Sequence, residues 1–535
     1  MSERRPRSVE NVSDQLADQI SGELSGQEGQ IRTGISRYDR QQLITGWDQE
    51  KLSSARMVII GSDVLANYLA MNAAALGFGT IEICGQGIVD SIDLAQDFKN
   101  YSKGFSLFKN GTKANLIAEF AQKLNPAVKT RGLNLNLASI KNIQLIEKPD
   151  IIIEASSSIN SKANAIKYSR LKNIPLISVG CGPNIGKLGV YNPGNSMSRS
   201  DEVRYLENIL FHDIIGSQGT IVSSVMSSLA VDEARKILMP INNEKTIEDI
   251  LLYNLSSLER FAGDAGDAGD AGDTRGETGG THKLNYVQER EDFSDKKVLM
   301  IGAGALGNFA GLELVLNGIG NLTIVDDDTI EETNLNRQIF FYDKVGAGKA
   351  ETLASRLGQL NSNVNVDYLV ERITPESENV FKKGGYDLIV DTVDNNKSRA
   401  LLNYFSLKYK IPLISGGTRY NSGQVVVSVP GETACLNCKV DIDKLAVDGH
   451  QPQSCIHAAQ PSVITSNQII GGMIVGEVRS VLRPDKYGIC SNKISKYISE
   501  DEFRIGDLPA LQTCECSKNK RKLRSWMKKM KYLYE

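Results

Sequence analysis

The chain has 535 residues, more than one ordinary hydrophobic core supports, and its length predicts two domains of about 250 residues each. Hydrophobic residues make up 41% of it and charged residues 23%, a balance that excludes a mostly disordered protein. With 61 Lys and Arg against 64 Asp and Glu, the net charge of −3 provides no global positive field, so nucleic acid is not an expected partner.

The N-terminal segment, residues 1–36, is polar and poor in aromatic residues, and we expect it to be disordered. No apolar core segment follows its charged residues, so we predict no secretory signal. No apolar run approaches the roughly 18–20 residues that a membrane span needs. Eight cysteines, clustered toward the C-terminus, are too few for a disulfide scaffold and favour metal and thiol chemistry in a reducing compartment. We therefore expect a cytoplasmic protein without a membrane partner.

Short apolar runs alternate with longer helix-compatible stretches after residue 36. Strands of this length, buried on both faces and joined by helical crossovers, are typical of a parallel, doubly wound α/β sheet. The fold class is therefore predicted as α/β, with Rossmann-like domains. The predicted strands are 57–60, 80–83, 150–153 and 174–178, and then 297–301, 321–325, 386–390 and 411–415.

Composition changes abruptly in the middle of the chain. From Ala262 to Asp273 the triplet Ala-Gly-Asp occurs four times, and glycine and charged residues continue beyond it. Such a sequence cannot form a core, so residues 262–282 are predicted to be a flexible linker; an ordered array of turns is the alternative. The linker separates a first domain, 37–261, from a second domain, 283–516, which a basic tail, 517–535, follows.

The two halves match each other. The sequence Ile-Pro-Leu-Ile-Ser occurs at 174–178 and again 237 residues later, at 411–415. Four matches in the same order indicate an ancient tandem duplication, because chance would have to reproduce both order and spacing. The other matched pairs are 58–63 with 299–304, 77–81 with 318–322, and 150–153 with 387–390.

A glycine-rich turn follows the first predicted strand of the second half. Gly302, Gly304 and Gly307 would let backbone N–H groups approach phosphate oxygens at the positive end of the next helix, although dehydrogenases use such a turn too. About twenty residues further on, Asp326 is placed to bind ribose hydroxyls, with Asp328 close behind it. The pattern predicts a nucleotide site.

Other polar residues indicate that this nucleotide is a triphosphate. They are Asn334, Arg337, Gln338 and Lys349, and then Asp394 beyond the next strand. The cations would neutralise charge on a leaving pyrophosphate, and Asp394 can hold a magnesium ion. The alternative is that these residues are solvated surface charges.

The first half lacks the corresponding residues. Asp63 stands where the second half has Gly304, and an acid there removes both room and favourable charge for a phosphate. Ser157 stands where the second half has Asp394. We therefore predict a competent second half and an inactive first half.

Two cysteine pairs, Cys435 with Cys438 and Cys514 with Cys516, lie far apart in the second half. Four thiolates can close a tetrahedral structural zinc site, which would tie the C-terminal segment to the sheet. The second pair has one intervening residue instead of the usual two or more, so Cys490 is an alternative ligand. Four buried free thiols are the alternative to a metal site.

Cys455 lies in a loop with neighbouring Gly and Pro, just before a helix predicted at 465–482. A thiol near a helix start is accessible and can have a lowered pKa, both of which a nucleophile requires. A spectator cysteine is the alternative. Cys84 and Cys181 follow predicted strands and are interpreted as packing residues.

These residues resemble the ubiquitin-activating enzymes and their bacterial sulfur-carrier relatives, which share the ThiF/MoeB type of adenylation fold. The resemblance covers most of residues 36–516, and its most specific part is Asp326-x-Asp328 followed by Asn334-Leu-Asn-Arg337-Gln338. It implies that an active and an inactive adenylation domain form an intramolecular pseudo-dimer, so we expect a monomer.

The resemblance also implies residue roles. In that family the partner fold contributes an arginine finger from an Arg-Tyr-x-Arg-Gln segment, which residues 37–41 match, so Arg40 takes this role. Cys455 matches the catalytic cysteine of members that carry it on the crossover loop. The remaining implied roles are ribose binding for Asp326, phosphate binding for Asn334, Arg337 and Lys349, and magnesium binding for Asp394.

The predicted function is ATP-dependent activation of a ubiquitin-like protein that ends in Gly-Gly. Its C-terminus would be adenylated, transferred to Cys455 as a thioester, and passed to a conjugating enzyme. Larger family members recruit that enzyme through a C-terminal ubiquitin-like domain, which we expect to be absent because nineteen residues follow Cys516. The alternatives are a sulfur-carrier adenylyltransferase leading to a thiocarboxylate, and a nicotinamide-binding oxidoreductase or non-catalytic scaffold. The fused, degenerate first half favours the activating enzyme.

The last segment holds eight Lys or Arg in the fourteen residues from Lys518 to Lys531, with Trp526 among them. A helix that docks an acidic partner, a nucleic-acid or localisation patch, and a solvated basic tail are all compatible with this composition.

Overall fold

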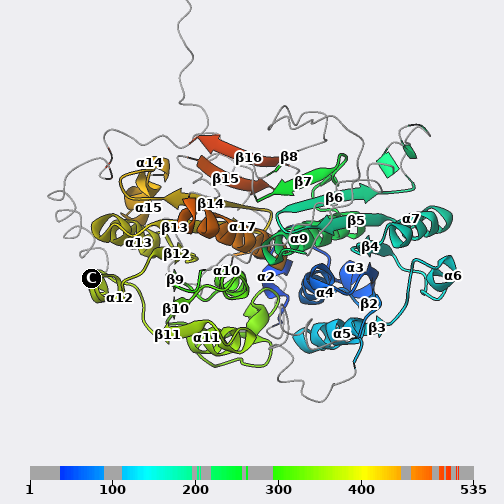
Figure 1. Cartoon of the computed structure of the whole chain (residues 1–535), viewed down its shortest axis with the longest axis horizontal. Helices are drawn as coiled ribbons and strands as arrows, with labels where there is room; N and C mark the ends of the chain where they lie inside the picture. Colours follow the sequence, from blue (N-terminus) through cyan, green and yellow to red (C-terminus); the bar gives the residue numbers. More distant parts are fainter. Residues whose placement is uncertain are drawn as a thin grey trace, which may run out of the picture. The chain divides into compact units, whose positions relative to one another are not determined.

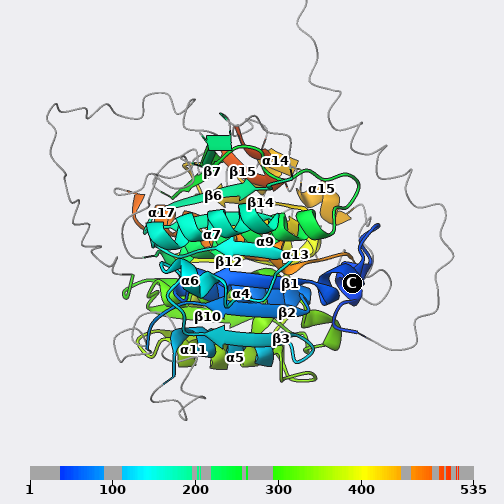
Figure 2. The same cartoon turned by 90° about the vertical axis from the view of Figure 1, so that its right-hand side faces the viewer.

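A computed structural model describes both halves of the chain (Figures 1 and 2). The described residues are 36–88, 111–194, 200, 202–203, 205–206, 218–255, 261–262, 293–440, 442–447, 460–484, 493–498, 502–507, 514 and 516. Cys455 and Cys490 lie outside these ranges. So do nearly all of the predicted N-terminal segment and linker, and the whole basic tail.

The first half forms an eight-stranded sheet in the order β3-β2-β1-β4-β5-β6-β7-β8. Its first five strands are parallel, and the last three continue it in antiparallel pairing. The strands are β1 (Arg56–Ile60), β2 (Thr80–Cys84), β3 (Lys129–Leu133), β4 (Ile151–Glu154), β5 (Leu176–Cys181), β6 (Ile185–Tyr191), β7 (Leu251–Asn254) and β8 (Phe261–Ala262).

The second half repeats this topology with the order β11-β10-β9-β12-β13-β14-β15-β16. Again five strands are parallel and three are antiparallel, so the predicted tandem of parallel, Rossmann-like sheets is confirmed. The strands are β9 (Lys297–Ile301), β10 (Asn321–Val325), β11 (Asn365–Leu369), β12 (Leu388–Asp391), β13 (Leu413–Arg419), β14 (Ser422–Ser428), β15 (Lys493–Ile498) and β16 (Glu502–Asp507).

Helices cover both faces of each sheet, and side-chain caps start several of them: Thr112 caps α5, Ser158 caps α7 and Asn395 caps α13. In the first half the helices are α2 (Asp39–Gln42), α3 (Gln49–Ser54), α4 (Val64–Leu76), α5 (Lys113–Leu124), α6 (Ile140–Ile143), α7 (Ile159–Lys172) and α9 (Thr220–Leu238). In the second half they are α10 (Ala305–Leu316), η3 (Glu332–Asn334), η4 (Ile339–Phe341), α11 (Lys349–Leu360), α12 (Glu378–Gly384), α13 (Asn396–Tyr409), α14 (Leu436–Val440), α15 (Ile442–Val447) and α17 (Ile464–Leu482).

The central strands carry runs of apolar residues because both of their faces are buried. In β1, Met57 and Ile59 face one hydrophobic core, whereas Val58 and Ile60 face another on the opposite side of the sheet. Successive side chains of a strand point to opposite faces, so a two-sided strand needs a continuous apolar run. This is why the strand cores could be read directly from the sequence.

The two halves share one hydrophobic core. In Figure 1, α9 of the first half and α17 of the second lie between the two sheets, and these helices pack on each other and on α4 and α10. Polar contacts cross the same interface: Tyr68 Oη donates to Glu313 Oε1 at 2.5 Å, and Gln468 Nε2 donates to the carbonyl oxygen of Ser224 at 3.1 Å. The tandem halves therefore form an intramolecular pair.

Glycine allows α17 to cross α10 closely. A Cβ atom on Gly471 would lie 2.6 Å from Phe309 Cβ and 3.2 Å from the backbone nitrogen of Ala310. Neither of these atoms can rotate away, because one lies on the backbone of α10 and the other directly beside it.

Substituting Gly471 with alanine should therefore destabilise the protein, because α10 and α17 would have to move apart at a cost of about 1–3 kcal/mol. Gly358→Ala is the matched control: it lies in α11, and no described atom lies within 4 Å of its added Cβ. The free energy of unfolding of that control should rise by about 0.5–1 kcal/mol, because alanine has a higher helix propensity than glycine. Thermal unfolding of both variants checks the pair, and an increased midpoint for Gly471→Ala would contradict this packing.

Candidate functional site

The glycine-rich turn joins β9 to the start of α10. Gly302 has φ +103°, which favours glycine, and a Cβ on Gly307 would lie 2.2 Å from the carbonyl oxygen of Gly302. Gly304 is different, because no described atom lies within 4 Å of the position of its Cβ. The open space at Gly304 adjoins the N-terminus of a 12-residue helix, where backbone N–H groups and the helix dipole favour a phosphate.

The aspartates after β10 lie beside this turn. Asp326 accepts hydrogen bonds from the backbone N–H groups of Ala303 (2.6 Å) and Asp328 (2.9 Å), and burial raises the pKa of its carboxyl group. Asp328 Oδ2 pairs with Lys349 Nζ at 2.8 Å. Lys349 is the first residue of α11, so two strand ends and a helix start place these charged groups at one edge of the sheet.

The segment from Asn334 to Gln338 is largely buried. Asn334 Oδ1 accepts the backbone N–H of Glu331 at 3.0 Å, so its Nδ2 is the side-chain group suited to a phosphate oxygen. Arg337 donates to the carbonyl oxygen of Thr333 (2.6 Å) and to Asn336 Oδ1 (2.7 Å), which holds its guanidinium in place. Gln338 Oε1 is buried, and no described residue donates a hydrogen bond to it.

The first half contributes the short helix α2 to this site. Gln41 Oε1 accepts a hydrogen bond from Asn336 Nδ2 at 3.0 Å, and the carbonyl oxygen of Arg40 accepts one from the N–H of Ser462 at 3.2 Å. Arg40 itself is buried. Tertiary structure thus brings Arg40 to the segment that carries Arg337, although the two are almost 300 residues apart in the chain.

Asp394 is exposed and follows β12 by three residues. Hydrogen bonds that sequence analysis did not predict hold the turn that carries Asp394. Arg399 donates hydrogen bonds to Asp391 Oδ2 at 3.1 Å and to the carbonyl oxygen of Val393 at 2.6 Å. Thr392 Oγ1 donates one to the carbonyl oxygen of Gly302 at 2.8 Å. The only available signal was an acid at the end of a buried strand and an arginine in the next helix.

The corresponding positions of the first half are occupied by protein side chains. Asp63 pairs with Lys113, the first residue of α5, at 3.5 Å, and the N–H of Leu65 at the start of α4 donates to Gln218 Oε1 at 2.9 Å. Gly85 stands where the second half has Asp326, and a Cβ there would lie 2.5 Å from Ser62 Cβ. A carboxylate and an amide thus lie at the N-terminus of α4.

The two cysteine pairs come together in space. Cys435 Sγ lies 3.4 Å from Cys514 Sγ, Cys438 Sγ lies 3.4 Å from Cys516 Sγ, and all four sulfur atoms lie within 4.8 Å of one another. A tetrahedral zinc ion with Zn–S bonds of about 2.3 Å requires sulfur–sulfur separations of about 3.8 Å. The donor set and its spacing therefore fit zinc.

The remaining described cysteines lie away from these sites. Cys84 and Cys181 are buried at the ends of β2 and β5, and burial raises the pKa of each thiol to about 12. Neither thiol is suited to nucleophilic chemistry. Cys455, the predicted nucleophile, lies outside the described residues.

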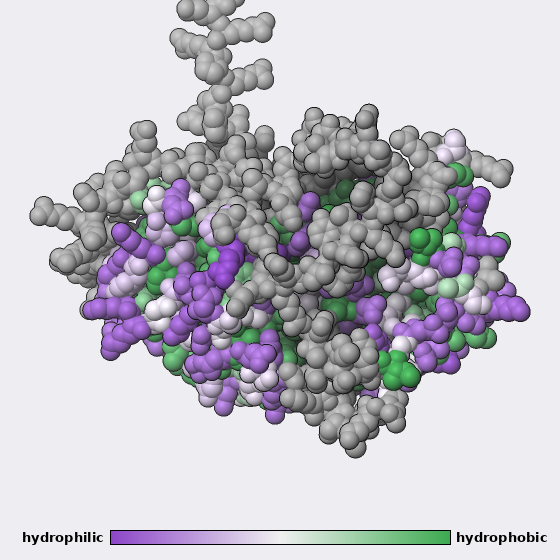
Figure 3. Space-filling view, viewed as in Figure 1, coloured by the Kyte–Doolittle hydropathy of each residue, from purple (hydrophilic) through white to green (hydrophobic). Residues whose placement is uncertain are grey.

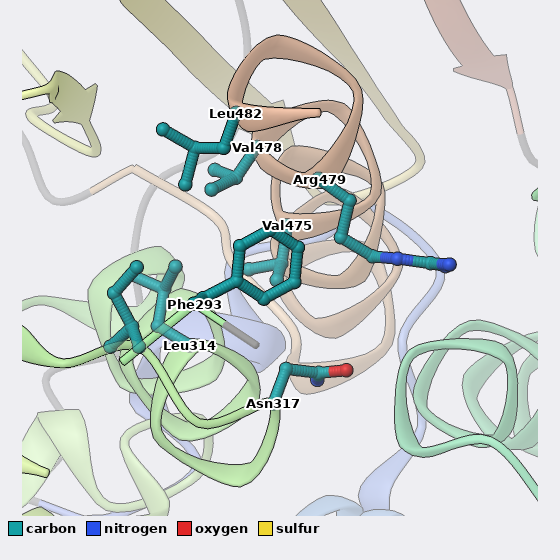
Figure 4. Close-up of a pocket in the computed structure, with 8 residues that line it drawn as sticks. Phe293, Leu314, Asn317, Val475, Val478, Arg479 and Leu482 are labelled. Carbon is teal, nitrogen blue, oxygen red and sulfur yellow. The ribbon is translucent and has the colours of Figure 1, made fainter. Parts of the chain in front are cut away.

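A small apolar pocket lies elsewhere, between α10 and α17 (Figure 4). Phe293 faces Val475 and Leu314 across it, and none of the predicted nucleotide-binding residues lines it. Two of its lining residues contact the first half: Asn317 Nδ2 donates to Thr220 Oγ1 at 3.0 Å, and Arg479 donates to Asn184 Oδ1 at 3.4 Å. All of its lining residues belong to the second half, so the pocket lies within that half, next to the interface.

The described surface in Figure 3 is predominantly hydrophilic over both halves. Among the described residues, no helix has both the length and the apolar character that a membrane crossing requires.

Comparison with known proteins establishes the family. The ThiF family profile matches residues 38–265 and again residues 282–522. These two segments account for most of the sequence, so the chain belongs to the ThiF family, in a tandem arrangement.

Three curated relatives are similar to part of the chain. The adenylyltransferase and sulfurtransferase UBA4 of Yarrowia lipolytica is 36% identical over 148 residues, 28% of this chain and 37% of that protein. The tRNA threonylcarbamoyladenosine dehydratase of Escherichia coli is 34% identical over 140 residues, 26% of this chain and 52% of that protein. The SAMP-activating enzyme E1 of Haloferax volcanii is 38% identical over 144 residues, 26% of this chain and 52% of that protein. The chain thus spans about half or less of the length of these relatives.

Proposed function

We propose that the chain is an ATP-dependent activating enzyme for a ubiquitin-like protein with a C-terminal Gly-Gly. One observation carries this proposal: α2 of the first half docks on the segment of the second half that holds Arg337. A nucleotide at Gly304 would then meet basic residues from both halves, which a dinucleotide dehydrogenase does not need. The names of two relatives, an activating enzyme and an adenylyltransferase, support the same reaction class.

ATP would bind with its phosphates over Gly304 and the start of α10 and its ribose at Asp326. Gly302 and Gly307 shape the turn, and Asn334 Nδ2 and the Gln338 side chain would contact the nucleotide. Asp394 would hold Mg²⁺, which screens the negative charge of the triphosphate, and Asp328 would help to bind the nucleotide. Arg40, Arg337 and Lys349 would neutralise the charge that develops on the departing pyrophosphate.

In the first reaction, a carboxylate oxygen of the carrier's C-terminal glycine attacks the α-phosphorus of ATP. The new P–O bond forms as the bond to the bridging oxygen breaks, so pyrophosphate leaves and an acyl-adenylate remains. Cys455 would then attack the acyl carbon as a thiolate, forming a C–S bond while AMP leaves. A conjugating enzyme would accept the acyl group from this thioester.

The first half would act as a structural partner without nucleotide chemistry. The Asp63–Lys113 ion pair and the Gln218 cap of α4 support this assignment, since both occupy the position of a phosphate. On this proposal the chain is a monomer, with an inactive domain at 37–261 and an active domain at 283–516.

Zinc held by Cys435, Cys438, Cys514 and Cys516 would fasten the C-terminal segment to the turn after β14. We expect metal analysis of the purified protein to find zinc, and Cys514→Ser to lose it and to lower stability by a few kcal/mol. Cys181→Ser, a buried thiol outside the cluster, should retain the zinc. Equal zinc content in both variants would contradict the site.

Sulfur-carrier adenylyltransferase is the second candidate, because one relative is named an adenylyltransferase and sulfurtransferase. In that reaction the outer sulfur of a persulfide, instead of Cys455, would displace AMP from the acyl-adenylate and form an acyl disulfide. A second thiol would then attack the inner sulfur, so that a disulfide forms and the carrier leaves as a thiocarboxylate. Mass spectrometry of the carrier distinguishes the two products.

The proposed function is tested by incubating the protein with ATP, Mg²⁺ and a diglycine-ended carrier, followed by denaturing gels with and without reductant. A carrier-sized upshift that reductant removes is expected. Pyrophosphate exchange without such a band would favour the sulfur-carrier reaction. Exchange that needs no protein carrier would refute both and point to a small or tRNA-borne carboxylate.

A further inference from the structure

We infer that Arg399 is a positioning residue that holds the turn carrying Asp394 in the orientation needed to bind Mg²⁺ with the nucleotide. This inference rests on the proposed role of Asp394 and assigns a new role to its neighbour Arg399.

The guanidinium of Arg399 bridges three parts of the second half. Its Nε donates to Asp391 Oδ2 at 3.1 Å, and one terminal nitrogen donates to the carbonyl oxygens of Val393 at 2.6 Å and Gly416 at 2.7 Å. Arg399 thus joins α13 to the end of β12, to the turn after it and to β13. Val393 immediately precedes Asp394, so one of these bonds acts on the turn next to the proposed ligand.

Further bonds surround the same carboxylate and the same turn. Asp391 is completely buried, and it accepts from Ser415 Oγ at 2.6 Å and from the N–H of Val393 at 3.1 Å. On the other side of Asp394, Asn395 Oδ1 accepts the N–H of Ser398 at 2.8 Å. The backbone is therefore fixed on both sides of Asp394, whose own side chain is exposed.

A lysine could not make this set of bonds. The planar guanidinium offers several N–H groups in a fixed arrangement, whereas an ammonium is a single point on a flexible chain. The partners of Arg399 lie in three different segments, so they require the wider group. Metal sites are commonly tuned by residues of this kind, which bind the ligand's neighbours and leave the metal itself to the ligand.

The first half allows a comparison, because its corresponding strand, turn and helix carry no carboxylate equivalent to that of Asp394. Glu154 and Lys162 stand at the positions of Asp391 and Arg399, and Ser157 stands at that of Asp394. Here Ser156, through its hydroxyl and its N–H, donates to Glu154 Oε1. The strand, turn and helix still form, so the fold tolerates a Glu/Lys pair where the second half has Asp/Arg.

The duplication supplies both the test variant and its control. Asp391→Glu with Arg399→Lys copies the pair of the first half into the second, and Glu154→Asp with Lys162→Arg makes the reciprocal change. Binding of a non-hydrolysable ATP analogue to the full chain is measured by calorimetry across a range of Mg²⁺ concentrations, and pyrophosphate exchange is measured over the same range.

For the Asp391→Glu/Arg399→Lys variant, we expect the Mg²⁺ concentration for half-maximal binding to rise about 10–100-fold, with recovery at high Mg²⁺ and little change in thermal midpoint. The reciprocal variant should match the unmodified protein. An unchanged Mg²⁺ dependence would overturn the inference, and so would an altered KM for the carrier with unchanged Mg²⁺ dependence.

If the double variant does not unfold cooperatively, Arg399→Gln serves as the second variant, since a neutral amide cannot make all three of the hydrogen bonds that Arg399 makes. It should show the same Mg²⁺ shift. If Arg399→Gln also fails to fold, Asp391 and Arg399 are an ion pair that stabilises the fold, and the inference is wrong. Failure of the proposed function gives a different result, because the unmodified protein would then bind no Mg²⁺–nucleotide or would bind it equally well after Asp394→Ala.

Discussion

Replacing Asp394 with alanine is expected to lower carrier-dependent ATP–pyrophosphate exchange by about 10²–10³-fold. Mg²⁺ stabilises transition-state charge by several kcal/mol, and each 1.36 kcal/mol corresponds to a tenfold change in rate. Thioester formation should fall with it, because no adenylate would be supplied. Radioactive pyrophosphate incorporation into ATP measures the effect.

The matched control for Asp394→Ala is Ser157→Ala, the same position in the first half. Because the first half is proposed to be inactive, this variant should exchange pyrophosphate at the unmodified rate. Asp394 is exposed, so Asp394→Ala should also unfold at nearly the unmodified temperature. Undiminished exchange by Asp394→Ala would refute its metal role, and a large loss in Ser157→Ala would refute the inactivity of the first half.

Changing Cys455 to alanine is expected to abolish the reductant-sensitive carrier adduct while pyrophosphate exchange continues. Adenylation uses the carboxylate of the carrier and the phosphates of ATP, whereas the thiol is needed only to capture the product. This variant should therefore show pyrophosphate exchange at the unmodified rate and no thioester adduct. Denaturing gels with and without reductant, run beside the exchange assay, provide the measurement.

Cys181→Ala is the control for Cys455→Ala, because its thiol is buried and burial raises its pKa to about 12. It should retain the adduct. A reductant-sensitive adduct in Cys455→Ala would show that another cysteine is the nucleophile. A thiocarboxylate on the carrier, with the adduct absent from the unmodified protein as well, would favour the sulfur-carrier reaction.

Four of the five parallel strands in each sheet were predictable because they are buried on both faces. The fifth, β3 in the first half and β11 in the second, was missed because it is largely exposed and mixes polar with apolar residues. Met57 to Ile60 and Val298 to Ile301 are apolar at every position, and such runs are recognisable without any contact information. The antiparallel extensions were mostly missed. Strands such as β15 (Lys493–Ile498) mix charged and apolar residues, so their pairing depends on the neighbouring strand more than on their own composition.

The predicted nucleotide-binding residues were recognisable because a phosphate turn imposes residue types at short spacing. Gly302 has a positive φ, and the backbone of Gly302 approaches Gly307 too closely for a side chain there. Both requirements involve residues that are close together in the sequence. Arg399 was missed for the opposite reason. Its partners lie in β12, the following turn and β13, and nothing in their spacing along the chain indicates that one guanidinium contacts all three.

The amino-acid sequence by itself determined the two parallel sheets, their duplication and the residue types of the phosphate turn, because strand burial and backbone geometry act over a few neighbouring residues. Only the tertiary structure gave the contacts between distant groups, which the cysteine pairs and the family resemblance had led us to expect. It places α2, which carries Arg40, against the segment that carries Arg337, and it places Cys435 beside Cys514, because the shared core of α9 and α17 and the packing after β14 bring these segments together. Such contacts depend on the sum of many packed side chains, which no local pattern contains.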